Sequence, residues 1–118
     1  MAADGKWWGS RVVHEFNLPE RLRAVAGCSR VGLVELTFDE EEQAVTATKT
    51  ALAMAQMLTR MSVATMDGKA VEQNGPEANA LLDCSPVVRV LLSQARQKVS
   101  QPTDEEIEAF LRGERLSV

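Results

Sequence analysis

The strongest pattern of hydrophobic and polar positions is helical and lies between Leu36 and Met66. This stretch contains neither Gly nor Pro and is dense in Ala, Met, Leu, Glu and Gln, which are strong helix formers. Apolar or small side chains recur along one side, some at intervals of seven residues. The repeat is Phe38, Val45, Leu52 and Thr59, and the side is widened by Ala44, Thr48, Ala51, Ala55, Leu58 and Ser62. The pattern predicts one long central helix with a broad apolar side.

Polar residues mark the start of this helix. Thr37 is the expected N-cap, and Glu40, three residues later, completes a capping box. Residues 39–42 are all acidic, which suits the positive end of a helix dipole. Successive residues of a helix point in different directions, so we interpret the acidic run as a solvated helix start and not as a metal site.

A second side of the predicted helix carries Met54, Met57 and Met61. Methionine side chains are flexible and polarisable, and they adapt to different helical partners. We therefore expect these three residues to bind a partner chain. The alternative, that they fill the core of their own domain, stays open.

Two segments before the long helix alternate apolar and polar residues, which predicts strands. Residues 10–18 place Val12, His14, Phe16 and Leu18 on one side, and residues 30–37 alternate in the same way. The residues between them are ambiguous between a short helix and an extended return. We expect the two strands to pair as an antiparallel hairpin, with the long helix covering its apolar side.

The second half of the chain begins with a turn signal at Asp67-Gly68, which predicts a two-residue hairpin and an end of the helix near Ser62. A short helix fits residues 77–83. Ser85 as N-cap and Pro86 at the first helical position open another helix. Its apolar stripe is Val88, Leu91, Leu92, Ala95 and Val99. A capping box at residues 103–106 starts a last helix, which carries Ile107, Phe110 and Leu111 and ends near Gly113.

These elements predict an α+β fold. A small antiparallel β-hairpin or sheet packs against a long central helix, and a second hairpin and two to three C-terminal helices follow. The 118 residues suffice for one domain with a modest core. We expect a flexible arm over residues 1–9, the domain over residues 10–113 and a tail over residues 114–118.

The predicted N-terminal arm contains the two tryptophans of the chain, Trp7 and Trp8. One hypothesis is that the arm docks these indole rings on a partner, which adds both residues to the predicted partner-binding set. The alternative is that one ring covers the core of the domain itself.

Composition narrows the classes of function. The chain is 45% hydrophobic and 25% charged, which is typical of a soluble globular protein. Its formal net charge of -4, without a cluster of Lys and Arg, argues against nucleic-acid binding. No apolar run reaches the ~20 residues of a membrane span, and none resembles a signal peptide. We therefore expect a cytoplasmic protein that binds neither nucleic acid nor membrane.

Residues suited to catalysis are sparse. Cys28 and Cys84 lack the paired spacing of metal ligands, and we expect two reduced, mostly buried thiols. His14 is the single histidine and has no second ligand type near it in sequence. No phosphate-binding loop, HExxH, CxxC or GxSxG motif occurs. We predict no catalytic residues, no metal and no cofactor, and hence a protein that is not an enzyme.

The helices predicted within residues 85–111 have the outline of a helix-turn-helix, and a small regulatory domain is therefore one alternative. The second helix of such a motif presents hydrogen-bond donors to DNA. Here it carries Asp104, Glu105, Glu106 and Glu108, which phosphates repel.

Three motifs together resemble a known family. Residues 35–41 read ELTF-x-EE, residues 66–71 contain DGK-x-V, and residues 83–111 read D-x-S-P-x-V-R-x-LL-x-QA…QPT-x-EE…FL. With the predicted N-terminal hairpin, they resemble the small tail-assembly proteins (tail assembly chaperone-like) of long-tailed bacteriophages and related contractile particles. The likeness runs from about Arg11 onward, and the Trp7-Trp8 pair is not part of it.

The resemblance implies a non-enzymatic protein that binds another tail protein, either the tape measure or a baseplate component. It would keep apolar helices of the tape measure from aggregating or help the baseplate to assemble, in the host bacterial cytoplasm. An alternative is a permanent structural subunit of the tail or baseplate, for which we expect self-association.

Overall fold

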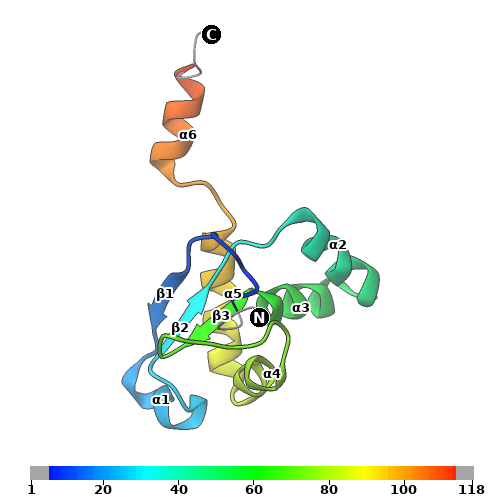
Figure 1. The fold of residues 1–118 in the computed structure, drawn as a ribbon, viewed down its shortest axis with the longest axis vertical. Helices are drawn as coiled ribbons and strands as arrows, with labels where there is room; N and C mark the ends of the chain where they lie inside the picture. The colour runs from blue at the N-terminus through cyan, green and yellow to red at the C-terminus, as the bar shows by residue number, and fades with distance from the viewer. Residues whose placement is uncertain (1–5, 114–118) are drawn as a thin grey trace.

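The computed structural model describes residues 6–113 and shows an α+β fold, as the sequence predicts (Figure 1). Its antiparallel sheet has the strand order β1-β2-β3-β4. The strands are β1 (His14–Asn17), β2 (Arg30–Leu33), β3 (Val63–Met66) and β4 (Lys69–Ala70). The helices are α1 (Glu20–Ala26), α2 (Phe38–Ala47), α3 (Ala51–Ser62), α4 (Pro76–Asp83), α5 (Pro86–Val99) and α6 (Asp104–Leu111).

Both predicted hairpins are confirmed. β1 pairs with β2, and β3 pairs with β4 across a two-residue turn. Asp67 and Gly68 have φ angles of 54° and 81°, the positive values that a type I′ turn requires. The Asp67 carboxylate accepts hydrogen bonds from the backbone N–H groups of Ser29 (2.8 Å) and Arg30 (3.0 Å). The turn therefore also fixes the start of β2.

The predicted long central helix is wrong in its extent, because residues 48–50 separate it into α2 and α3. The hydroxyl of Thr48 donates to the carbonyl of Ala44 at 2.7 Å, and the hydroxyl of Thr50 accepts from the N–H of Ala53 at 3.0 Å. Threonine is β-branched, and its hydroxyl offers the backbone alternative hydrogen bonds. These bonds end α2 and cap α3.

The main core lies between the sheet and helices α1, α4 and α5. Its buried residues are Leu18, Leu22, Ala26, Cys28, Val31, Leu33, Val63, Val71, Ala78, Leu81, Leu82, Val88 and Leu92. The predicted apolar stripe of α5 packs on this core, and α5 runs behind the sheet in Figure 1. The sheet is therefore covered by α5 with α1 and α4, and not by the predicted central helix. Helix α3 packs against α5.

A second, smaller core forms around Trp8, Val34 and Ala64, with Trp7 and Val13 at its border. Trp8 is only 6% exposed. Residues 6–9 therefore do not form the free arm that the sequence suggested. The rest of the predicted arm, residues 1–5, and the predicted tail, residues 114–118, lie outside the described residues.

Helix α6 extends away from the rest of the molecule, at the top of Figure 1, and contributes to the longest dimension of 51 Å. The structure describes every residue of α6, and none is buried. Among the described residues, 6–113, no helix has both the length and the apolar character needed to cross a membrane.

Candidate partner-binding surface

Large apolar side chains on α2 and α3 face solvent. Phe38 is 89% exposed, and Val45 and Leu52 are also exposed. These residues belong to the seven-residue repeat that predicted a core-facing side, and of that repeat only Thr59 is buried. The prediction fails because α2 turns its other side, which carries the buried Ala44, toward the protein, so that Phe38 and Val45 face solvent. The break after α2 then places Leu52 on a separate helix.

The predicted methionine set is divided by the structure. Met61 is only 5% exposed, whereas Met54 and Met57 are partly exposed. Met57 and Met61 both line a groove of ≈ 240 Å³ between α2, α3 and the loop after β4, which we call the Met groove. It is lined by Gln43, Ala47, Met57, Met61, Gln73 and Asn74. The sequence-predicted pair Met57 and Met61 is thus brought together, and Met54 does not line this groove.

Trp7 and Trp8, which the sequence suggested as partner-binding residues, contact other residues of their own chain. The indole Nε1 of Trp7 donates to the carbonyl of Val71 at 3.0 Å. The Trp7 and Trp8 rings meet edge to face at 5.4 Å, and the Arg11 guanidinium lies 5.4 Å from the centroid of the Trp7 ring. Trp8 is therefore a core residue, as the alternative interpretation stated, and Trp7 is held against the same core.

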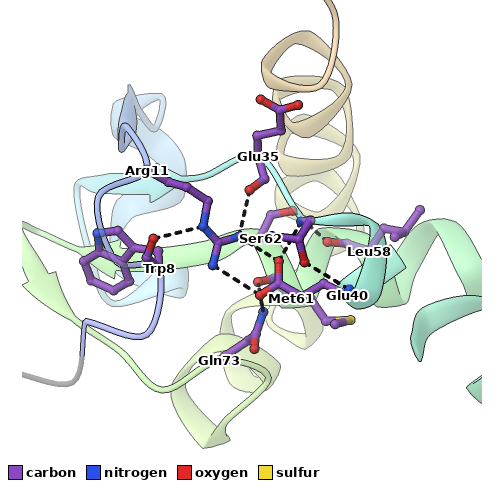
Figure 2. A network of polar contacts seen from close by, with 9 residues as sticks. Trp8, Arg11, Glu35, Glu40, Leu58, Met61, Ser62 and Gln73 are labelled. Atoms are coloured by element: carbon purple, nitrogen blue, oxygen red, sulfur yellow. Dashed lines mark hydrogen bonds and ion pairs between the residues drawn. The ribbon is translucent and has the colours of Figure 1, made fainter. Parts of the chain in front are cut away.

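A polar network joins the N-terminal segment to the start of α2 (Figure 2). Arg11 Nη1 donates to Glu40 Oε1 at 2.7 Å, and Arg11 Nη2 donates to Glu40 Oε2 at 3.3 Å. The same guanidinium donates to the backbone carbonyls of Trp8 and Glu35 at 2.9 and 3.0 Å. Arg11 therefore ties the N-terminal segment to the residues on both sides of the α2 N-cap.

Glu40 is the centre of this network. Besides Arg11, its carboxylate accepts from Gln73 Nε2 at 3.0 Å and from the backbone N–H of Thr37 at 2.9 Å, which completes the predicted capping box. Burial alone raises the pKa of Glu40, but the hydrogen bonds from Arg11, Thr37 and Gln73 outweigh it and hold the pKa below its ordinary value. The group is therefore an ionised structural anchor at neutral pH.

The same network supports the Met groove. Gln73 Nε2 also donates to the carbonyl of Met61 at 3.3 Å. Gln73 thus connects α2, through Glu40, with the end of α3. Polar contacts therefore position the walls of the groove, and the partly exposed Met57 offers a side chain of an intrinsically flexible type.

Helix α6 carries a second exposed apolar surface. We define the α6 face as Ile107, Phe110 and Leu111, of which Phe110 is 82% and Leu111 75% exposed. The predicted capping box is present, with Thr103 N donating to Glu106 Oε1 at 2.8 Å. Sequence reasoning placed the α6 face on a helix but did not select it as a binding surface. The signal was the Gln101-Pro102 break, which separates these residues from the preceding helix.

A cleft of ≈ 440 Å³ lies at the base of α6. His14, Glu35, Lys98 and Glu106 are the ionisable residues among those that line it. Glu106 belongs to the first turn of α6, and Glu35 belongs to the segment that leads into α2, three residues before Phe38. The first turn of α6 and the segment that leads into α2 therefore lie beside the same cleft.

The surroundings of Cys28 and Cys84 make both thiols unreactive. Burial, with smaller contributions from Asp67 and Cys84, raises the pKa of Cys28 to about 11. Burial also raises the pKa of Cys84. Because the thiolate is the reactive form, both side chains are poor nucleophiles at neutral pH. Within residues 6–113, no group of three or more His, Cys, Asp and Glu residues is placed to hold a metal ion.

Comparisons with known proteins add no relative to this picture. No protein-family model, no curated protein and no solved structure matches the chain.

Proposed function

We propose that this chain is a non-enzymatic assembly protein that binds another protein through exposed apolar helix faces. The observation that carries the proposal is α6, which presents Ile107, Phe110 and Leu111 to solvent while none of its described residues is buried. The resemblance to phage tail-assembly proteins, which runs from about Arg11 onward, supplies the class: binding of a tape-measure or baseplate protein in the host bacterial cytoplasm.

Physical chemistry favours a partner for α6. A helix of eight residues is marginally stable in water by itself, and most helices are stabilised by packing of an apolar side. Burial of one Phe or Leu side chain contributes about 1.5–3 kcal/mol. Contact with a second chain would therefore stabilise α6 and remove its apolar face from water.

The Met groove offers a second contact with different properties. Met57 is partly exposed and lies beside the buried Met61, so an incoming apolar side chain would meet an adaptable surface. Adaptable grooves suit partners that present several similar helices. This matches what the resemblance implies for a protein that covers the helices of a tape measure.

Co-expression with the tail proteins of the same phage tests the proposal. The wild-type chain should co-purify with the tape-measure or a baseplate protein, identified by mass spectrometry, and the double variant Phe110→Asp/Leu111→Asp should not. Val12→Asp is the matched control, because Val12 is 67% exposed and lies in the segment before β1. Equal recovery of the tail protein by wild type and double variant would contradict the proposal.

A permanent structural subunit is the alternative within the same class, since a projecting α6 also suits contacts between neighbouring subunits. Purified particles distinguish the two. An assembly chaperone is missing from particles purified on a density gradient, whereas a structural subunit remains with them.

A further inference from the structure

Charge is distributed unevenly between the exposed apolar helices and the rest of the chain. Helices α2 and α6 together contain eight Asp and Glu residues and no Lys or Arg. The whole chain has 17 acidic and 13 basic residues, so its remaining residues comprise nine acidic and all 13 basic ones. The two helices therefore carry a formal charge of -8, and the remainder carries +4.

On α6, the carboxylates border the apolar face. With 100° between successive helical residues, Asp104 and Glu108 lie along one edge of the α6 face and Glu106 along the other. Glu105 lies on the opposite side of the helix. A partner that covers the α6 face therefore meets negative charge at both edges.

On α2, the arrangement is the same. Phe38 and Val45 lie seven residues apart on one side, and Glu41 and Glu42 flank the line between them. Both apolar residues are exposed. The two helices thus share one pattern, an exposed apolar line with carboxylates on both edges.

Basic residues near these helices neutralise only part of this charge. Arg11 is engaged with Glu40, Arg96 interacts with Glu41, and Lys98 lines the cleft beside Glu106. Arg112 lies 3.7 Å from Glu108, but both side chains are more than half exposed, and such pairs are weak.

We infer that the partner is an amphipathic helix whose apolar stripe is flanked by Lys or Arg side chains. The inference rests on the proposed function and specifies the chemistry of its partner. Apolar contact with α6 and α2 would supply affinity, and opposite charge at the edges would set orientation and exclude acidic helices. Contact between the α2 or α6 helices of two copies is disfavoured because it would bring together carboxylates.

Synthetic helical peptides test the inference on the full chain. The first probe has a leucine stripe flanked by Lys, and the second has the same stripe flanked by Glu. At low salt, the Lys-flanked peptide should bind at least about tenfold more tightly, and the difference should shrink as salt screens the charges. A Lys-flanked peptide with Ser in place of Leu should not bind measurably. Equal binding of this Ser peptide would reduce the effect to net charge and overturn the inference.

Charge reversal makes the test specific. The double variant Glu42→Lys/Glu108→Lys should prefer the Glu-flanked peptide, a gain of binding that unfolding cannot produce. The control Glu77→Lys/Glu105→Lys has the same change in net charge, but its residues lie on α4 and on the opposite side of α6. It should keep the wild-type preference, and equal loss of preference in both variants would contradict the inference.

Three further outcomes would contradict either the inference or the proposed function. A dimer in sedimentation that the Lys-flanked peptide cannot dissociate would assign the α6 face to a second copy and overturn the inference. Recovery of a tail protein that depends on Phe110 but not on the charges of Glu42 and Glu108 would overturn the inference alone. Loss of the dependence on Phe110 would contradict the proposed function itself.

Discussion

Arg11 and Glu40 form an ion pair, with Nη1 2.7 Å from Oε1, that joins the segment before β1 to the start of α2. Only 25% of the Arg11 side chain and 13% of the Glu40 side chain are exposed. The pair, its capping box and Gln73 set the position of α2 relative to the core. The orientation of the exposed apolar side of α2 therefore depends on Arg11, which precedes this helix by more than 20 residues.

Substitution of Glu40 should destabilise the protein through this contact. Glu40→Ala removes the carboxylate that completes the capping box and leaves a partly buried guanidinium without its carboxylate, so we expect a loss of about 2 kcal/mol in the free energy of unfolding. Chemical denaturation monitored by circular dichroism measures it. Glu42→Ala, on the exposed side of the same helix, is the control and should change stability by less than about 0.5 kcal/mol. Equal effects of the two substitutions would refute the role of Glu40.

The same residue predicts a pH dependence. The pKa of Glu40 is lowered from 4.5 in the folded protein, so its folded state favours the ionised form. The stabilisation is complete above pH 4.5 and is lost as pH falls through the lower, folded pKa. The difference in unfolding free energy between wild type and Glu40→Gln should therefore be constant near neutral pH and shrink below pH 4.5. A difference that grows on acidification would contradict this assignment.

Gly32 is predicted to be intolerant of a side chain. A Cβ atom there would overlap the hydroxyl of Thr65, its partner on β3, and lie 2.5 Å from Cγ1 of Val13. We expect Gly32→Ala to lower stability by about 1–3 kcal/mol in thermal or chemical unfolding. Addition of Thr65→Ala should recover part of the loss, since the buried Thr65 hydroxyl has no hydrogen-bond partner among residues 6–113. Strictly additive effects would show that the overlap is not the cause.

The methionine residues should separate into structural and binding roles. Met61→Ala is expected to cost about 2–5 kcal/mol of stability, because Met61 is only 5% exposed. Met57→Glu should leave a folded protein and weaken partner binding, because Met57 lines the Met groove and is partly exposed. Unfolding curves and co-purification measured on both variants test this. Full partner binding by folded Met57→Glu would remove the groove from the proposed interface.

Local signals predicted much of the fold. The Asp67-Gly68 turn, the Ser85 cap and the Thr103 capping box each specify a backbone geometry within a few residues, and all three are present. The apolar stripe of α5 could also be predicted, because all of its residues lie on one uninterrupted helix.

The features that the sequence did not reveal depend on contacts between elements that are distant in the chain. The exposure of Phe38 depends on the orientation of α2, which turns Glu40 and Ala44 toward the protein and Phe38 toward solvent. The burial of Trp8 depends on its contact with Val34 and Ala64, which are distant in sequence. The isolation of α6 could be predicted only with the knowledge that the apolar stripe of α5 already packs on the sheet.

Photo-crosslinking from the α6 face tests the central claim most directly. A photoreactive phenylalanine analogue replaces Phe110 in the full chain, and the same analogue at Val12 serves as the control. During tail assembly, the chain modified at position 110 should crosslink to a tape-measure or baseplate protein, and the chain modified at position 12 should not. The absence of any crosslink from position 110, or equal crosslinking from both positions, would contradict the claim that this face binds a partner.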